Sequence, residues 1–202
     1  HEPGLSAEQR KERVTAMLEK TGLGPKYLRR FPHELSGGQA QRVAIARALI
    51  LEPKVLVCDE AVAALDGTVR EQVLALLRRV QEETGLAIIF ITHDLAVVRA
   101  VSHRVAVMYL GSLVEMASNK DLFASPQHPY TRALLEAVPV PDPANPGGRS
   151  SVSGEVPSAL QPPAGCAFHP RCSQVIKACR SSRPSYREVG TTTVSCHLVE
   201  PE

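Results

Sequence analysis

Apolar residues near the start of the chain recur with the period of an α-helix. Val14, Met17 and Leu18 form an apolar stripe that ends at Lys20. The segment before it, Ser6-Ala7-Glu8-Gln9, has the spacing of a capping box, in which two side chains satisfy backbone N–H groups at a helix N-terminus. A helix ending near Lys20 is therefore expected.

Two further helical segments are expected before Pro53. Residues 26–31 form a short piece that reaches Pro32. Residues 38–51 are rich in Ala, Arg, Leu and Gln, which are good helix formers, and Pro53 closes this segment.

Short apolar runs alternate with helical patterns from residue 54 onward. Strands are predicted at 54–59, 86–91, 104–109 and about 113–115, and helices at about 68–83 and 94–101. This alternation is typical of an α/β fold with a parallel sheet, whose active groups lie beyond the carboxyl ends of the strands.

The composition changes in the last third of the chain. Residues 118–138 predict two short helices, whereas residues 139–164 are rich in Pro, Gly and Ser and predict a linker. Residues 165–202 hold four of the five cysteines and few large apolar groups. Such a tail is expected to need covalent or metal staples, because it cannot bury a core of its own.

Overall composition excludes some classes of function. The 202 residues carry a formal net charge of only +2, which gives no support for binding nucleic acid or a membrane surface. The 44% apolar content is ordinary for a globular protein, and no apolar run approaches the length of a membrane span. The N-terminus also lacks a signal-peptide pattern.

Two stretches carry candidate chemistry. Residues 35–39, Leu-Ser-Gly-Gly-Gln, form a turn that opens a helix, where unpaired backbone N–H groups and the helix dipole favour a phosphate. Residues 55–60, Val-Leu-Val-Cys-Asp-Glu, place two carboxylates at the end of a buried strand, which suits Mg²⁺ and water. Taken singly, the first could be an ordinary turn and the second a helix-capping corner.

The order of the motifs is more specific than either motif. The 35–39 turn is followed by a helix with Gln41-Arg42, then Asp59-Glu60, Ala64-Leu65-Asp66 and Ile91-Thr92-His93-Asp94. This series resembles the ATP-binding subunits of ABC transporters, with a signature motif, a Walker B strand, a D-loop and a switch histidine. The resemblance implies a P-loop NTPase-like α/β domain that uses ATP and Mg²⁺.

The resemblance also implies roles for single residues. Asp59 would hold Mg²⁺ through water, Glu60 would be the general base for the attacking water, and His93 would contact the γ-phosphate. Asp66 would couple the two sites of a dimer, although it could equally cap a helix. The signature residues Ser36, Gly37, Gly38 and Gln39 would face ATP held by a second subunit.

The sequence departs from the family pattern at several positions. Ala61 and Ala63 replace the usual Pro and Ser after the catalytic Glu. No G-x-x-x-x-G-K-[ST] phosphate loop occurs, so the chain by itself is not expected to bind ATP tightly. We therefore expect it to be the C-terminal portion of a longer polypeptide that supplies one half of a shared site.

The cysteines suggest a metal group. Cys58 lies in a predicted strand and is read as a small apolar residue. Disulfides are disfavoured among the four tail cysteines, because an ATPase of this kind faces the reducing cytosol. Zinc usually uses C-x2-C pairs, which are absent, whereas four thiolates suit an iron–sulfur cluster, with His169 and His197 as fallback ligands. The tail cysteines are Cys166, Cys172, Cys179 and Cys196.

The C-terminal third narrows the resemblance. His128-Pro129-Tyr130, a Pro-rich linker and a Cys-x-Phe-x-x-Arg-Cys segment resemble the C-terminal extension of oligopeptide and dipeptide transporter ATPases. This subfamily implies a 4Fe-4S cluster, with Zn²⁺ as the alternative, and ATP-driven peptide import. It also implies a peripheral location on the cytoplasmic face of the inner membrane. The implied partners are a second ATP-binding domain, identical or different, the transmembrane permease subunits and, indirectly, an extracytoplasmic peptide-binding protein.

Three alternatives stay open at this point. The transported solute could be another one, such as nickel, or the chain could be a non-catalytic regulatory or assembly module with a metal-bound tail. DNA-repair and chromosome-organising ATPases share the signature helix, but they predict a long coiled coil and a basic face that this sequence lacks.

The expected division of the chain has five parts. They are the end of a helical subdomain (1–37), the C-terminal part of a RecA-like ATPase core (38–117), a helical extension (118–138), a linker (139–164) and a Cys-rich metal-binding tail (165–202).

Overall fold

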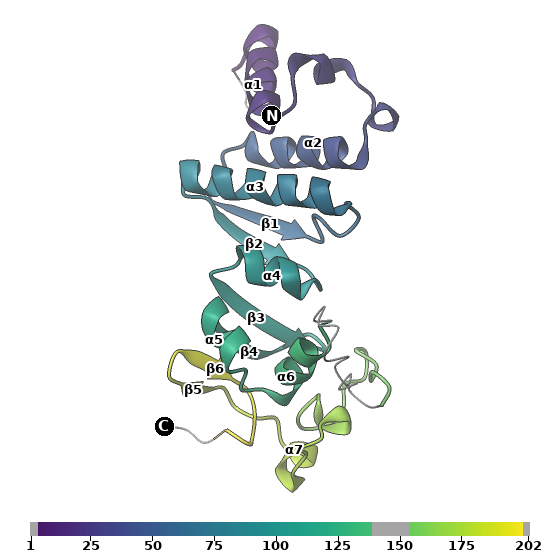
Figure 1. The fold of residues 1–202 in the computed structure, drawn as a ribbon, viewed down its shortest axis with the longest axis vertical. Coiled ribbons are helices and arrows are strands. Elements are labelled where there is room, and N and C mark those ends of the chain that lie inside the picture. The colour runs from purple at the N-terminus through teal and green to yellow at the C-terminus, as the bar shows by residue number, and fades with distance from the viewer. Residues whose placement is uncertain (1–3, 139–153, 200–202) are drawn as a thin grey trace, which may run out of the picture. The chain divides into compact units, whose positions relative to one another are not determined.

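The computed structural model describes residues 4–138 and 154–199 (Figure 1). Contacts divide the chain into two units, His1–Asp94 and Leu95–Glu202. Each unit is described by itself. Most of the predicted linker, residues 139–153, lies outside the described residues.

The first unit begins with helices that match the helical pattern of the sequence. Helix α1 (Ala7–Lys20) starts at the predicted capping box, with Ser6 and Gln9 each bonding the other's backbone N–H. The expected piece at 26–31 is the 3-10 helix η1 (Pro25–Arg29), which begins at Pro25, and a second 3-10 helix, η2 (Pro32–Glu34), begins at Pro32. Helix α2 (Gly37–Leu49) follows.

The strands of the first unit pair in parallel, as predicted. Strand β1 (Val55–Asp59) pairs with β2 (Ala87–Ile91) in register, with Asp59 opposite Ile91. Helix α3 (Gly67–Thr84) connects them and lies between α2 and the strands (Figure 1). One side of α3 is fully buried, whereas one face of the strand pair leaves Val55, Val57, Ile89 and Ile91 exposed.

The second unit has an antiparallel sheet, which corrects the expectation of one parallel sheet. After helix α4 (Leu95–Val101), strand β3 (Arg104–Tyr109) turns directly into β4 (Ser112–Ser118). The turn residues Leu110 and Gly111 both have positive φ, at 44° and 74°, as a two-residue hairpin turn requires. A two-residue connection is too short to cross over to a parallel strand, so β4 must run antiparallel.

The tail contributes strands to this sheet, which the sequence pattern does not reveal. Strands β5 (Arg187–Val189) and β6 (Thr192–Val194) form a hairpin, and β6 pairs with β4 in the described sheet order β3-β4-β6-β5. Val194 is fully buried, and Phe168 is 2% exposed. The tail thus shares the core of the preceding residues instead of burying a core of its own.

An aromatic cluster joins the tail to the sheet. The rings of Tyr109 and Phe168 meet edge to face with centroids 5.2 Å apart, and Tyr130 packs against both. Tyr130 lies on helix α6 (Pro129–Glu136), which follows helix α5 (Asn119–Ala124). The remaining elements of the tail are η3 (His169–Arg171) and α7 (Lys177–Ser181).

The His-Pro-Tyr segment has a structural role at the start of α6. The Nδ1 atom of His128 accepts the backbone N–H of Tyr130 at 3.0 Å, and Pro129 occupies the first helical position. The buried carboxylate of Glu115 accepts the N–H groups of Gln127 and His128 at 2.7 and 2.9 Å. Each member of the motif therefore fixes the entry into α6.

Within the described residues, no helix combines the length and apolar character needed to cross a bilayer.

The buried His128 predicts a loss of stability in acid. Burial, and secondarily the charge of Arg132, lowers the His128 pKa from 6.5 to about 4. The unfolded chain therefore binds a proton that the folded chain rejects between these pH values. Stability should fall by about 2–3 kcal/mol as pH drops from 6.5 toward 4, because protonation also removes the Nδ1 acceptor.

Urea unfolding at pH 7 and pH 4.5 measures this change. His128→Asn keeps a capping side chain but removes the titrating group, so its unfolding free energy should depend less on pH than that of the unchanged chain. An equal pH dependence in both proteins would contradict the assignment to His128.

Candidate functional site

The structure brings Glu60 and His93 together at the carboxyl ends of β1 and β2. The Nδ1 atom of His93 lies 2.9 Å from Oε1 of Glu60. Both side chains reach solvent, with His93 81% and Glu60 42% exposed. An acid and an imidazole that share a hydrogen bond at an open strand end can hold and deprotonate a water molecule.

The backbone of Glu60 has an unusual conformation that aims its side chain. Its φ is 48°, in the left-handed region that residues other than glycine rarely adopt. Its N–H donates to the carbonyl of Ile91 at 3.0 Å, which extends the pairing of the two strands by one step. The parallel ladder therefore fixes the acid beside the residues that lead into His93.

The other two acidic candidates lie on either side of the loop that follows β1. Asp59 is the last residue of β1 and is exposed on the strand's open face. Asp66 is the N-cap of α3, where its Oδ1 accepts the N–H of Val69 at 2.9 Å. The simple capping role considered for Asp66 is therefore present in the structure.

The turn at residues 35–39, called the signature turn below, already uses part of its hydrogen-bonding capacity. Ser36 and Gln39 form a capping box, with bonds of 3.0 and 3.4 Å, and Gln39 Nε2 also donates to the Tyr27 hydroxyl at 3.1 Å. Among the described residues, the amides of Gly37 and Gly38 have no partner. These two amides are the groups that remain for an anion at the N-terminus of α2.

Gly38 permits a close approach between α2 and α3. A Cβ atom at this position would lie 2.3 Å from Cγ1 of Val69, and one at Gly37 would lie 3.8 Å from Leu65. Any larger residue than glycine at position 38 would push against the first turn of α3. The signature turn and the loop that carries Asp66 are thus in direct contact.

The four tail cysteines gather in the second unit. Cys179 and Cys196 are buried, and the N–H of Cys166 donates to the carbonyl of Cys179 at 2.9 Å. Burial raises the pKa of Cys166, Cys172 and Cys196, and charge on the neighbouring thiols raises each further. The thiols are therefore near enough to interact electrostatically.

No group of three or more His, Cys, Asp or Glu side chains in residues 4–138 and 154–199 is placed to hold a metal ion. His169 and His197, the fallback metal ligands, have other contacts. One ring nitrogen of His169 lies 2.9 Å from the Cys166 carbonyl, and one of His197 lies 2.9 Å from the Ser182 carbonyl.

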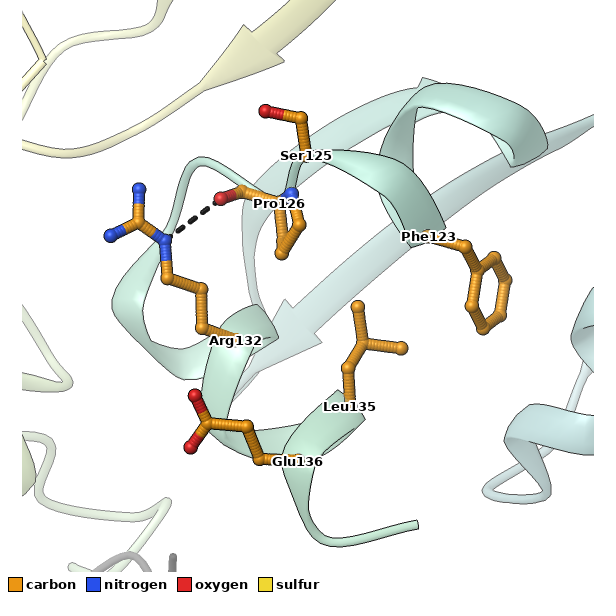
Figure 2. A pocket seen from close by; sticks show the side chains of 6 residues that line it. All are labelled: Phe123, Ser125, Pro126, Arg132, Leu135 and Glu136. Atoms are coloured by element: carbon orange, nitrogen blue, oxygen red, sulfur yellow. Dashed lines mark hydrogen bonds between the residues drawn. The ribbon is translucent and has the colours of Figure 1, made fainter. Parts of the chain in front are cut away.

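A separate cavity of about 510 Å³ lies between α5 and α6 (Figure 2). Phe123, Pro126 and Leu135 form its apolar wall, and Arg132 is held at its rim by a bond from Nε to the Pro126 carbonyl at 2.8 Å. None of the residues predicted to be functional lines it.

Sequence reasoning missed Arg70 and Glu115. Arg70 donates a hydrogen bond to the carboxylate of Asp94 at 2.8 Å, and Glu115 accepts the backbone N–H groups just before α6. Neither belongs to a short motif. An arginine in the first turn of a helix, where the dipole disfavours a cation, is the one signal that could have pointed to Arg70.

Two family descriptions match separate parts of the chain. Residues 2–63 match the family described as ABC transporter, and residues 114–179 match the family described as oligopeptide/dipeptide transporter, C-terminal region.

Curated relatives are similar over nearly the whole chain. A probable peptide ABC transporter ATP-binding protein of Sinorhizobium fredii is 52% identical, with 98% of this chain and 56% of that protein covered. The oligopeptide transport ATP-binding protein OppF of Escherichia coli is 48% identical, with 100% and 61% covered. The chain thus spans little more than half the length of the curated relatives it matches.

Solved structures show the same fold for part of the chain. A dimeric ATP-binding cassette, MJ0796, bound to ADP and phosphate, has a TM-score of 0.53 and 33% identity, covering 59% of this chain and 51% of that one. The cbiO1 protein of Clostridium perfringens, part of the transporter complex cbiONQ, has a TM-score of 0.54 and 38% identity, covering 61% and 49%.

Gly38→Ala should destabilise the first unit by about 1–3 kcal/mol, because the added methyl group overlaps Val69. Val69→Ala removes the overlapping atoms, so the double variant should recover part of this loss. Urea unfolding of the single and double variants measures the coupling. If Gly38→Ala unfolds like the unchanged chain, α2 and α3 are not in the close contact described.

Proposed function

Since the chain belongs to the ABC transporter ATP-binding proteins with an oligopeptide/dipeptide transporter C-terminal region, we propose that it is part of a subunit that hydrolyses ATP to power peptide import. The single observation that carries this proposal is the 2.9 Å contact between Glu60 and His93 at the ends of two parallel strands. The names of the relatives supply the solute and the direction, since they describe peptide or oligopeptide transport and, for a relative from Brucella abortus, putative peptide import.

Each functional residue at the strand ends has a separate role in the proposed hydrolysis of ATP. Glu60 takes a proton from the attacking water, and His93 holds Glu60 in place while its other ring nitrogen faces the γ-phosphate. Asp59 would hold Mg²⁺, which neutralises charge on the phosphates when bound. Asp66 adds to its capping role a contact across a dimer.

The other half of the proposal concerns a neighbouring ATP-binding domain. Gly37 and Gly38 present their amides to ATP held by that domain, identical or different, so that intact ATP bridges the two. The solved relative MJ0796 is a dimer, and cbiO1 is part of a transporter complex, which supports this arrangement. Opening and closing of the dimer would drive permease subunits and, indirectly, release from a peptide-binding protein.

We propose that the subunit is peripheral to the inner membrane, on its cytoplasmic face. This location follows from the proposed partners, because ATP is cytoplasmic and the permease subunits span the bilayer.

For the tail, we propose that Cys166, Cys172, Cys179 and Cys196 hold a 4Fe-4S cluster rather than Zn²⁺. Four thiolates from loops, without the close C-x2-C pairs of most structural zinc sites, suit an iron–sulfur cluster better than a single zinc ion. The cluster would supply rigidity or electron transfer.

Reading the coding sequence upstream of the chain tests whether the complete subunit is an enzyme. A phosphate loop there is expected. Its absence from the full polypeptide would leave only participation in a neighbour's site and would favour the regulatory module.

Glu60→Gln should lower MgATP hydrolysis by the complete subunit by a factor of about 10²–10⁴, because the amide cannot accept the proton of the attacking water. Phosphate release measures the rate, and nucleotide binding should be retained. Glu71→Gln, which removes an exposed acid from α3 in the same unit, is the matched control and should hydrolyse ATP normally. Full activity of the Glu60 variant would refute the assigned base.

Anaerobic purification of the chain should give brown protein with about four irons and four sulfides, and Cys172→Ser should lose most of both. Cys58→Ala is the control, because Cys58 belongs to the first unit and burial raises its pKa to about 11, which keeps it a neutral thiol. Metal analysis and visible absorbance measure the outcome. Colourless protein with stoichiometric zinc would overturn the cluster.

A further inference from the structure

Arg70 joins two loops that carry functional groups in the first unit. Its Nη1 atom lies 2.8 Å from a carboxylate oxygen of Asp94, and its Nη2 donates to the carbonyl of Leu65 at 3.3 Å. Asp94 directly follows His93, and Leu65 directly precedes Asp66. One guanidinium group therefore ties the switch-histidine loop to the loop between β1 and α3.

The contacts of Asp94 make this tie relevant to His93. The N–H of Asp94 donates to the Thr92 hydroxyl at 3.1 Å, which forms a tight turn around His93. Since His93 is 81% exposed, packing does not fix its ring, and its direction depends on this turn and on the bond to Glu60. Holding Asp94 thus holds the backbone that aims the imidazole.

The ion pair between Arg70 and Asp94 contributes little to stability. Arg70 and Asp94 are about one-third exposed, and the Nε atom of Arg70 is buried with no hydrogen-bond partner among the described residues. The desolvation cost of this buried, unpaired donor offsets much of the stability that the partly exposed ion pair contributes. The arrangement is better explained by the geometry that it imposes.

Two neighbours of Arg70, Val69 and Leu65, face the signature turn. Val69, the preceding residue, is the side chain that Gly38 must accommodate, and Leu65 lies against Gly37. The first turn of α3 therefore contacts the signature turn on one side and the switch-histidine loop on the other. A displacement of the signature turn can therefore be transmitted to His93 through the first turn of α3.

We propose that Arg70 is a positioning residue that couples the signature turn to the Glu60–His93 pair. Each chain would contribute both to its own site and to its neighbour's, and Arg70 would link the two contributions. The mechanistic meaning of this link rests on the proposed function. The link itself is a property of the folded chain and is tested without nucleotide.

The tautomer of His93 reports the link directly. With ionised Glu60 as acceptor, Nδ1 must carry the proton of the neutral ring. A ring released from Glu60 returns to the Nε2–H tautomer that free imidazole side chains favour. Imidazole ¹⁵N shifts, recorded at a pH of about 9 where histidines are neutral, give the tautomer ratio, and His93→Gln assigns the signal.

Arg70→Gln should raise the Nε2–H population of His93 at least threefold. Arg70→Lys should raise it less, because a cation beside Asp94 is retained. Asp94→Asn should reproduce the Gln variant, which keeps the test decisive if that variant does not fold. Arg47→Gln, at an exposed arginine on α2, is the matched control and should change nothing. Glu60→Ala, which leaves no acceptor for Nδ1, shows the signal of a fully released ring.

An unchanged tautomer ratio in both Arg70→Gln and Asp94→Asn, alongside a change in Glu60→Ala, would overturn the proposal. The coupling to the signature turn has its own test, since Gly38→Ala should shift the same signal and added Val69→Ala should reverse the shift. No shift with Gly38→Ala would limit Arg70 to the switch-histidine loop and would refute the coupling. The proposed function fails separately, by full hydrolysis in Glu60→Gln.

Discussion

The parallel pairing of β1 and β2 is the constraint on which the candidate site depends. Their in-register ladder ends at Asp59 and Ile91, and the N–H of Glu60 extends it by one hydrogen bond. Because parallel strands end at the same edge of a sheet, residues separated by 33 positions in sequence meet there at 2.9 Å. The left-handed backbone of Glu60 is tolerated because the ladder and the bond to His93 both hold it.

The same edge connects to the rest of the first unit through α3. The capping carboxylate of Asp66, the fork of Arg70 and the close contact of Val69 with Gly38 all lie in or before the first turn of this helix. A helix that packs across two strands through a fully buried apolar side cannot tilt freely, since packed interiors resist small deformations. The first turn of α3 therefore holds two exposed loops in place, the one between β1 and α3 and the one that carries His93.

The second unit shows that the cysteine tail is built on protein packing. Phe168 enters the core that β3, β4 and α5 begin. Val194 on β6 is fully buried, and the pairing of β6 with β4 fixes the chain just before Cys196. The His-Pro-Tyr segment belongs to the same construction, because Tyr130 packs on Phe168 and His128 begins α6.

The sequence by itself determined the helices, the first strands and the order of the motifs, because capping boxes, periodicity and proline act within a few residues. Ser6 and Ser36 began their helices where local pattern placed them, and β1 and β2 paired in parallel as the intervening helix required. Only the tertiary structure decided that β6 pairs with β4, that Arg70 reaches Asp94, and that Phe168 lies among Tyr109 and Tyr130. These contacts join residues far apart in sequence, and their free energy comes from burial and pairing that no short pattern encodes.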